Sequence, residues 1–168
     1  MEDFDEAYLG TPPWDIGRPQ PVFVRLAEEG AIRGRVLDAG CGTGEHVLMV
    51  AAMGLDATGI DAAPTAIEIA RRKAAERGVT AGFHVFDDES RARYVVSLAA
   101  VVPPGGRYLM ACFSDLQPGD WGPRRVSQAE IRDAFARGWS VDSVSAEMFE
   151  TNMNPSTAHA WLARMTRV

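Results

Sequence analysis

Cysteine is scarce in this chain: only Cys41 and Cys112 occur among its 168 residues. Two thiols give almost no material for a disulfide framework or a thiolate metal site, so we expect both to be reduced and structural. The histidine, cysteine and acidic residues also show none of the spacings of common metal motifs, such as HExxH or CxxC. The sequence therefore predicts no metal site.

Long apolar runs and blocks of like charge are lacking too. No apolar stretch reaches the length needed to cross a bilayer, and the acidic start, Met1 to Glu6, is the opposite of a signal peptide's positive start. The net charge is −6, from 17 basic and 23 acidic residues, and no basic block could bind phosphate backbones or an anionic membrane. We expect a cytoplasmic protein that binds neither nucleic acid nor membranes.

Apolar residues are plentiful by contrast, at 46% of the sequence. That share is enough to build a core, and 168 residues fit one domain. We expect a single domain over residues 1–168, in which residues 1–20 form an aromatic, proline-rich arm.

Helical and strand patterns alternate along most of the chain. Helices are expected over residues 21–30, 45–54, 64–78, 88–102 and 127–138, with proline or capping residues at several starts and glycine or proline after the ends. Strands are expected over residues 35–38, 56–60, 79–86, 107–113, 139–149 and 158–168. This order predicts an α/β fold: a mostly parallel sheet, covered by helices on both faces, with a C-terminal antiparallel hairpin.

The strongest signal for function is a glycine loop between the strand at 35–38 and the following helix. It reads Val36-Leu37-Asp38-Ala39-Gly40-Cys41-Gly42-Thr43-Gly44, and it lies at the carboxyl end of a strand, where open α/β sheets bind ligands. The glycines allow a tight turn and a close approach of the backbone to a ligand. The free N–H groups of the following helix favour a carboxylate there.

A dinucleotide fingerprint fits this loop poorly. It would need glycine or alanine at position 45, where this chain has Glu45, a side chain unsuited to a pyrophosphate. A nucleotide-dependent oxidoreductase therefore stays an alternative that Glu45 disfavours.

A second element follows Gly40 by twenty-one residues: Asp61, at the end of the next strand. A carboxylate there can accept hydrogen bonds from both hydroxyls of an adenosine ribose. The other interpretation is that Asp38 and Asp61 only cap loops and that the glycines only permit turns.

The two elements together resemble the signature of class I S-adenosylmethionine-dependent methyltransferases. Ile60-Asp61-Ala62-Ala63 matches the second part of that signature, and Pro104-Gly105-Gly106 is similar to a third mark of the family. The resemblance implies a Rossmann-like class I methyltransferase sandwich that uses S-adenosyl-L-methionine. The glycine loop would wrap the methionine part and Asp61 would hold the ribose. The implied cofactor-binding residues are Asp38, Ala39, Gly40, Cys41, Gly42, Thr43, Gly44, Asp61 and Ala62.

The arm narrows the resemblance to one branch. Pro12-Pro13-Trp14-Asp15-Ile16-Gly17-Arg18-Pro19-Gln20-Pro21 resembles the opening segment of the thiol, thiopurine and halide methyltransferases, in which the arm closes over the cofactor. The resemblance implies a small-molecule acceptor, such as a thiol, a halide or a phenol-like group. Trp14 would join the cofactor-binding residues, because its indole face can attract a sulfonium through cation–π interaction. Alternatively, Trp14 only packs the arm onto the core.

His84 is the candidate catalytic residue for proton handling, since the unperturbed pKa of histidine lies near neutrality. The segment from Phe83 to Asp88 resembles the one after the family's fourth strand, where side chains face the substrate. The alternative is a packed histidine with a satisfied ring nitrogen. His46 and His159 have no stronger claim.

The chain departs from the family between Gly78 and Asp88. Only one strand fits there, whereas the family has a strand, a helix and another strand, and such a unit needs about 30 residues. We therefore expect a gap around residues 79–83, with most of the third strand, the following helix and part of the fourth strand lacking. In the family these parts supply an adenine contact and a pocket wall, and their loss would expose a strand edge.

Three explanations of the gap stay open. The printed sequence omits a disordered stretch, or a deletion is repaired by altered packing, or a second subunit in a possible homodimer compensates for it by exchange of elements. The gap also motivates an alternative function, a catalytically degenerate protein that binds the cofactor or a partner without turnover.

Overall fold

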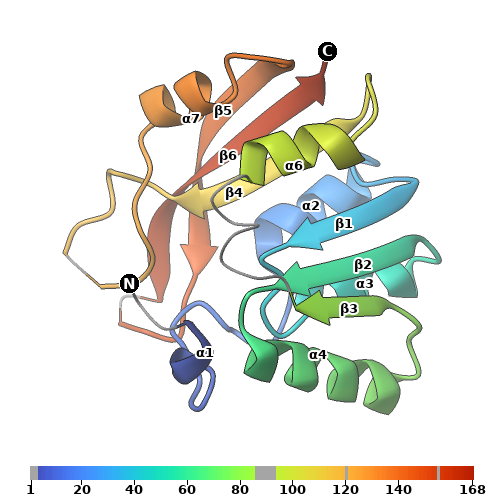
Figure 1. Ribbon diagram of the computed structural model, residues 1–168. Coiled ribbons are helices and arrows are strands. Elements are labelled where there is room, and N and C mark those ends of the chain that lie inside the picture. Colours follow the sequence, from blue (N-terminus) through green and yellow to red (C-terminus); the bar gives the residue numbers. More distant parts are fainter. Residues whose placement is uncertain (1–3, 86–93, 120, 155) are drawn as a thin grey trace. The chain divides into compact units, whose positions relative to one another are not determined.

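The computed structural model describes residues 4–85, 94–119, 121–154 and 156–168 (Figure 1). The chain divides into two compact units, Met1–Asp88 and Glu89–Val168, and each is described by itself. The expectation of a single domain over residues 1–168 stays a prediction. No helix in the described ranges has the length and apolar character that a bilayer crossing requires.

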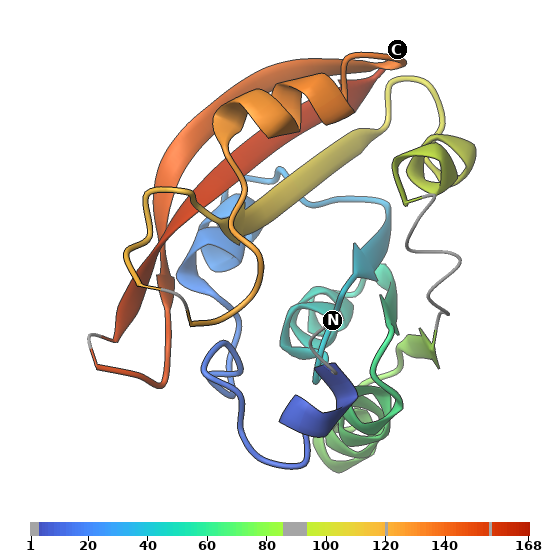
Figure 2. The same ribbon diagram turned by 60° about the vertical axis from the view of Figure 1, so that its left-hand side comes forward.

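The N-terminal unit is built on a three-stranded parallel sheet of β1 (Arg35–Ala39), β2 (Asp56–Asp61) and β3 (Gly82–Val85), with β2 in the middle. The connections are α3 (Glu45–Ala52) and α4 (Pro64–Arg77). Both helices lie on the same side of the sheet (Figure 2). Val47 and Ile67 share one buried cluster with Phe83 of β3, so the apolar faces of α3 and α4 hold this side of the sheet.

Helix starts and ends in this unit follow the predicted pattern. Pro21 opens α2 (Pro21–Glu28) and Pro64 opens α4, and α4 ends at Gly78 in the left-handed conformation, φ 63°. Ala63, which precedes α4, has no side chain that could cap it. Asp5 of the short helix α1 (Phe4–Ala7) provides the cap instead, since its Oδ1 accepts the N–H of Thr65 at 2.7 Å.

The C-terminal unit is built on a second three-stranded sheet, in which β6 (Thr157–Arg167) lies between β4 (Arg107–Phe113) and β5 (Trp139–Glu150). It runs antiparallel to both neighbours, so the predicted hairpin of the last two strands is confirmed. Trp161 and Met165 of β6 pack with Ile131 of α7 (Gln128–Ala134) and Leu98 of α6 (Tyr94–Val101).

The structure differs in one detail from the expected gap, in which most of the third strand was lacking. Residues 82–85 take the place beside β2 that a third strand would have, so this edge of the sheet is filled. Between β3 and β4, the described residues contain the helix α6 and no further strand. The predicted capping pair Asp87-Asp88 lies outside the described residues. Among the described strands none pairs with the outer edge of β1, and Leu37 on β1 is 43% exposed.

The capping box at the start of α7 provides a test of the local fold. Ser127 Oγ accepts the N–H of Glu130 at 3.2 Å, and Glu130 Oε2 accepts the N–H of Ser127 at 2.9 Å. We expect Ser127→Ala to lower the free energy of unfolding by about 1 kcal/mol, because the N–H of Glu130 in the first turn of α7 loses its acceptor. Urea denaturation measures this change. Gln128→Ala is the control, and equal stability of the two variants would contradict the assignment.

Candidate functional site

The carboxylate of Asp61 joins the tips of β1 and β2. Its Oδ2 accepts the N–H of Gly42 at 2.7 Å, and its Oδ1 accepts the N–H of Ala63 at 2.9 Å. Asp61 is only 9% exposed. The glycine loop and the predicted carboxylate therefore lie side by side, as the sequence predicted.

Burial raises the pKa of Asp61 above its usual range, although the N–H groups of Ala63 and Gly42 counteract part of this effect. The charge of Asp38 adds to the upward shift. A further group that donates hydrogen bonds to Asp61 would stabilise its ionised form. A sugar hydroxyl is such a donor.

The glycine loop turns sharply, with φ of 81° at Gly40 and 52° at Gly42. A Cβ at Gly42 would lie 2.7 Å from Tyr8 Oη, so a side chain there would displace the tyrosine. A Cβ at Gly40 would meet nothing within 4 Å, and this residue is exposed. The loop thus has one face covered by the arm and one open face.

Four backbone amides of the loop itself, which precede α3, are hydrogen-bonded within the protein. Gly40 and Cys41 both donate to the carbonyl of Ile60, at 2.8 and 3.0 Å. Gly42 donates to Asp61, and Gly44 donates to the carbonyl of Cys41 at 2.9 Å. These four amides are used within the protein and are therefore not available to a ligand, because they hold the loop in its turn.

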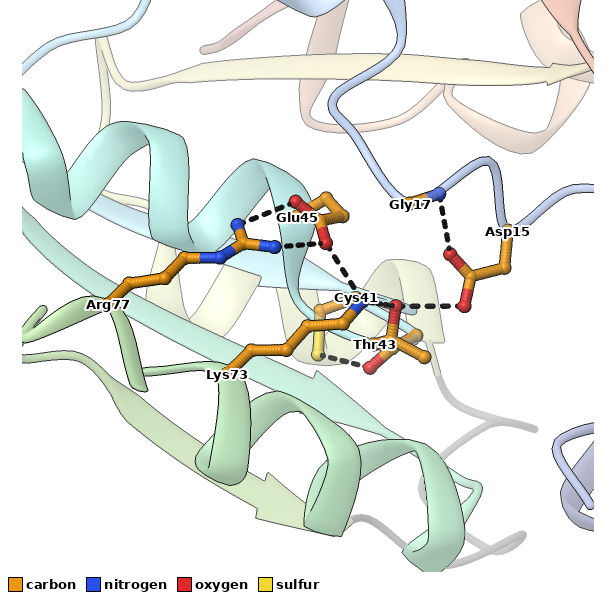
Figure 3. A network of polar contacts seen from close by, with 8 residues as sticks. Asp15, Gly17, Cys41, Thr43, Glu45, Lys73 and Arg77 are labelled. Carbon is orange, nitrogen blue, oxygen red and sulfur yellow. Dashed lines mark hydrogen bonds and ion pairs between the residues drawn. The ribbon is translucent and has the colours of Figure 1, made fainter. Parts of the chain in front are cut away.

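A polar network beneath the loop connects the arm to α3 and α4 (Figure 3). Thr43 Oγ1 donates to Asp15 Oδ2 at 3.0 Å and accepts from Lys73 Nζ at 2.7 Å. Lys73 also donates to Glu45 Oε1 at 2.8 Å, and Arg77 binds both carboxylate oxygens of Glu45 at 2.8 Å. One chain of charged and hydroxyl groups thus joins three segments that are distant in sequence: the arm, the glycine loop with the first turn of α3, and α4.

Glu45 is the centre of this network. Its side chain is 8% exposed. Burial alone would raise its pKa, but the hydrogen bonds and charges of Arg77 and Lys73 outweigh burial and lower the pKa. The ionised carboxylate lies in the first turn of α3, where a dinucleotide fold would place a pyrophosphate. This position adds weight to the argument against a dinucleotide.

The arm is fastened to the loop at several points. Trp14 Nε1 donates to Tyr8 Oη at 3.1 Å, and the Trp14 ring lies edge-on to Phe4, with 6.1 Å between ring centroids. Asp15 Oδ1 accepts the N–H of Gly17 at 3.2 Å, which shapes the turn after the tryptophan. Trp14 therefore has a packing role in the arm, whatever it contacts in a complex.

Asp38 and His46 lie near each other at the tip of β1. The backbone N–H of Gln20 donates to His46 Nε2 at 3.1 Å, so the proton of a neutral His46 is on Nδ1. This Nδ1 is 3.7 Å from Asp38 Oδ2, too far for a good hydrogen bond. Asp38 Oδ2 is buried and has no hydrogen-bond partner among the described residues.

The other predicted site residues have varied positions. Ala39 ends β1, and Ala62 follows Asp61 and contributes an N–H that lowers its pKa. Cys41 is buried, and burial raises the pKa of its thiol, which fits a structural role. His84 lies on β3 opposite Ile60 and is exposed, whereas its neighbour Phe83 faces the core. The structure does not bring His84 into a hydrogen bond with the glycine loop.

Sequence reasoning missed the residues that support the loop from a distance. Tyr8, Asp15, Lys73 and Arg77 carry no local motif, because their partners are far away in sequence. One signal was available: Glu45 is an acid at the start of a mostly apolar helix, and such a residue needs a cationic partner when buried. Lys73 and Arg77, one helical turn apart on α4, could provide it.

Comparisons with known proteins identify the family. The model of a methyltransferase domain matches residues 36–92. The 2-heptyl-1-hydroxyquinolin-4(1H)-one methyltransferase of Mycobacteroides abscessus is 35% identical over 88% of this chain and 77% of its own length. The chain belongs to the class I S-adenosylmethionine-dependent methyltransferases. Its cofactor is S-adenosylmethionine, and the oxidoreductase alternative is set aside.

Further relatives agree with this assignment. A solved structure from work on the conversion of a disulfide bond into a thioacetal group during echinomycin biosynthesis has a TM-score of 0.84 and 34% identity, over 98% of this chain and 91% of the other. The magnesium protoporphyrin IX methyltransferase of Synechocystis PCC 6803 with bound SAH has a TM-score of 0.65 and 20% identity, over 88% and 80% of the two chains. It shows the same fold.

A probable thiol methyltransferase of Arabidopsis thaliana is 42% identical, over 38% of this chain and 29% of its own length. The alignment with the hydroxyquinolone enzyme is also informative, since it spans 174 positions and so exceeds the 168 residues of this chain. Some positions of that relative therefore face gaps in this chain, in agreement with the expectation that this chain lacks an internal segment.

The network around Glu45 leads to a prediction about stability. We expect Glu45→Gln to lower the free energy of unfolding at neutral pH by about 3 kcal/mol, because Lys73 would be left largely buried without its anion. Because the pKa of Glu45 is lowered in the folded protein, its contribution is present at neutral pH and is lost as the pH falls through that lowered value. Urea denaturation at neutral and acidic pH measures both effects.

Glu68→Gln, on the exposed face of the same helix that carries Lys73, is the matched control. If Glu45→Gln and Glu68→Gln lower the free energy of unfolding by the same small amount, the network has no stabilising role.

Proposed function

We propose that this chain transfers the methyl group of S-adenosylmethionine to an acidic heteroatom of a small molecule. The preferred acceptor is a hydroxyl on a heteroaromatic ring, and a thiol is the second choice. The observation that carries this proposal is the 35% identity to a hydroxyquinolone methyltransferase over 77% of that enzyme. The partial match to a probable thiol methyltransferase supports the second choice.

The residues at the strand tips fit the cofactor. Asp61 is a buried acceptor suited to the ribose hydroxyls. The orphaned Oδ2 of Asp38 is suited to the cofactor's ammonium group. The open side of Gly40 lets the methionine part approach the backbone closely.

The chemistry that S-adenosylmethionine supplies is an electrophilic methyl group on a sulfonium. The protein has to align an acceptor with that methyl group and keep water out, which can contribute about 7–11 kcal/mol to lowering the barrier. We assign the exclusion of water to residues 1–20, the arm over the cofactor site, and the contact with the positive charge to Trp14. A thiolate needs little further help, whereas a hydroxyl needs a base to take its proton.

The assignment of the ribose contact to Asp61 is open to a binding experiment. We expect Asp61→Ala to bind S-adenosylhomocysteine about 10- to 100-fold more weakly in calorimetry, because hydrogen bonds to a charged acceptor are lost. Asp56→Ala, at the other end of the same strand, is the control. Equal affinity of Asp61→Ala and the parent would remove Asp61 from the site.

The pH dependence of binding gives a second readout of Asp61. Ribose hydroxyls donate to the ionised carboxylate, so binding should weaken as the pH falls. Because the pKa of Asp61 is raised, this weakening should begin above the usual titration range of an aspartate. In Asp61→Ala the same pH range should leave the residual affinity flat.

The acceptor and the role of His84 are tested together. Methyl transfer to a 1-hydroxyquinolinone, to thiophenol and to iodide is followed by mass spectrometry of the products, and we expect the hydroxylated ring to react fastest. If His84 is the base, His84→Gln should slow transfer to the hydroxyl by about 100-fold or more and leave transfer to the preionised thiol unchanged.

His159→Gln is the control for His84, since it removes an exposed histidine from the C-terminal unit. An unchanged rate with the hydroxyl acceptor would exclude His84 as the base. Binding of S-adenosylhomocysteine without turnover on any acceptor would favour the catalytically degenerate alternative.

A further inference from the structure

Tyr8 combines deep burial with a polar group that faces the candidate site. It is 8% exposed and packs with Ala63 and Ala66 at the start of α4. Its hydroxyl lies against the bare Cα of Gly42, where an added Cβ would be 2.7 Å away. The tyrosine therefore reaches the residue whose N–H is bound by Asp61.

The Tyr8 hydroxyl has an unused donor. A phenol oxygen can accept hydrogen bonds and also donate one. Here the oxygen accepts from Trp14 Nε1 at 3.1 Å, and no acceptor for the Tyr8 O–H is found among the described residues. A hydroxyl this deeply buried usually satisfies its donor, so an unsatisfied one at a site marks the place of a missing acceptor.

The surroundings keep this donor in its neutral form. Burial raises the pKa of Tyr8; the hydrogen bond from Trp14 counteracts part of this effect, and the charges of Asp61 and Asp15 add smaller upward shifts. Nearby negative charge also disfavours an anionic acceptor at this point. The missing acceptor is thus better supplied by a neutral oxygen than by a carboxylate.

A ribose diol has the chemistry that Asp61 and Tyr8 match as a pair. Each sugar hydroxyl donates one hydrogen bond and accepts others. The ionised Asp61 can only accept, and two backbone N–H groups leave some of its acceptor positions unused. An acid alone leaves the sugar oxygens without a donor, whereas Tyr8 is placed to provide one from the other side of Gly42.

We propose that Tyr8 is a cofactor-binding residue whose O–H donates a hydrogen bond to a ribose hydroxyl oxygen of the cofactor, opposite the acceptor Asp61. This inference rests on the proposed function, because it deepens the same cofactor site. If Tyr8 has this role, the arm helps to recognise the ribose in addition to covering the cofactor site.

The decisive experiment combines Tyr8→Phe with S-adenosylhomocysteine and its 2′-deoxy and 3′-deoxy analogues in calorimetry. Tyr8→Phe keeps the ring and its packing and removes only the hydroxyl. We expect it to bind S-adenosylhomocysteine about fivefold to tenfold more weakly than the parent, the loss of one neutral hydrogen bond. For the analogue that lacks the hydroxyl bound by Tyr8, the parent and the variant should bind equally.

A purely structural Tyr8 gives a different result. Loosening of the arm would weaken all three ligands by the same factor, and that outcome overturns the proposal. Equal affinity of the parent and Tyr8→Phe for S-adenosylhomocysteine also overturns it. Tyr108→Phe, which removes a hydroxyl from the C-terminal unit, is the control and should bind like the parent.

A second measurement keeps the test valid if Tyr8→Phe does not fold. The parent contains three tyrosines, so 3-fluorotyrosine labelling gives a simple fluorine NMR spectrum. The Tyr8 resonance should shift with adenosine and stay unchanged with adenine or with methionine. An unshifted resonance at saturating adenosine overturns the inference alone. A parent that binds neither adenosine nor S-adenosylhomocysteine overturns the proposed function as well.

Discussion

The hydrogen bonds of Asp61 are the constraint on which the rest of the site depends. One carboxylate holds the N–H of Gly42 in the glycine loop and the N–H of Ala63 at the start of α4, and so fixes the end of β2 relative to both. Because the amides of the loop are used within the protein, the loop keeps its shape without a ligand, and recognition falls to side chains around it. The site is therefore preorganised by the same acid that we assign to the ribose.

Local sequence was sufficient for the parts of the fold that are coded locally. Pro21 and Pro64 are the first residues of α2 and α4, because proline suits a first helical turn. Gly78 follows the last residue of α4, because glycine readily adopts the left-handed conformation at a helix end. The alternation of helices with β1 and β2 was also predictable from the sequence. It placed the glycine loop and Asp61 at the carboxyl ends of these two strands. The bounds of the last two strands were predicted to within about a residue, since apolar strands flank a turn-rich connector.

The supporting contacts were beyond sequence reasoning for a physical reason. The interaction of Lys73 with Glu45 joins residues 28 positions apart, and that of Asp15 with Thr43 joins residues 28 apart as well. No periodicity or cap connects such pairs, and only the closed fold brings them together. His84 shows the converse limit: its residue type suggested proton handling, but its direction on β3 depends on the pairing with β2, which puts Phe83 and not His84 toward the core.

The position of β6 in the second sheet has a consequence for folding during synthesis. Both β4 and β5 find their hydrogen-bonded neighbour in β6, and it follows them in the chain. During synthesis the backbone N–H and C=O groups of β4 and β5 therefore stay unpaired until β6 has left the ribosome. Folding of this half is governed by long-range pairing, which is slow, and the waiting strands have exposed edges in the meantime.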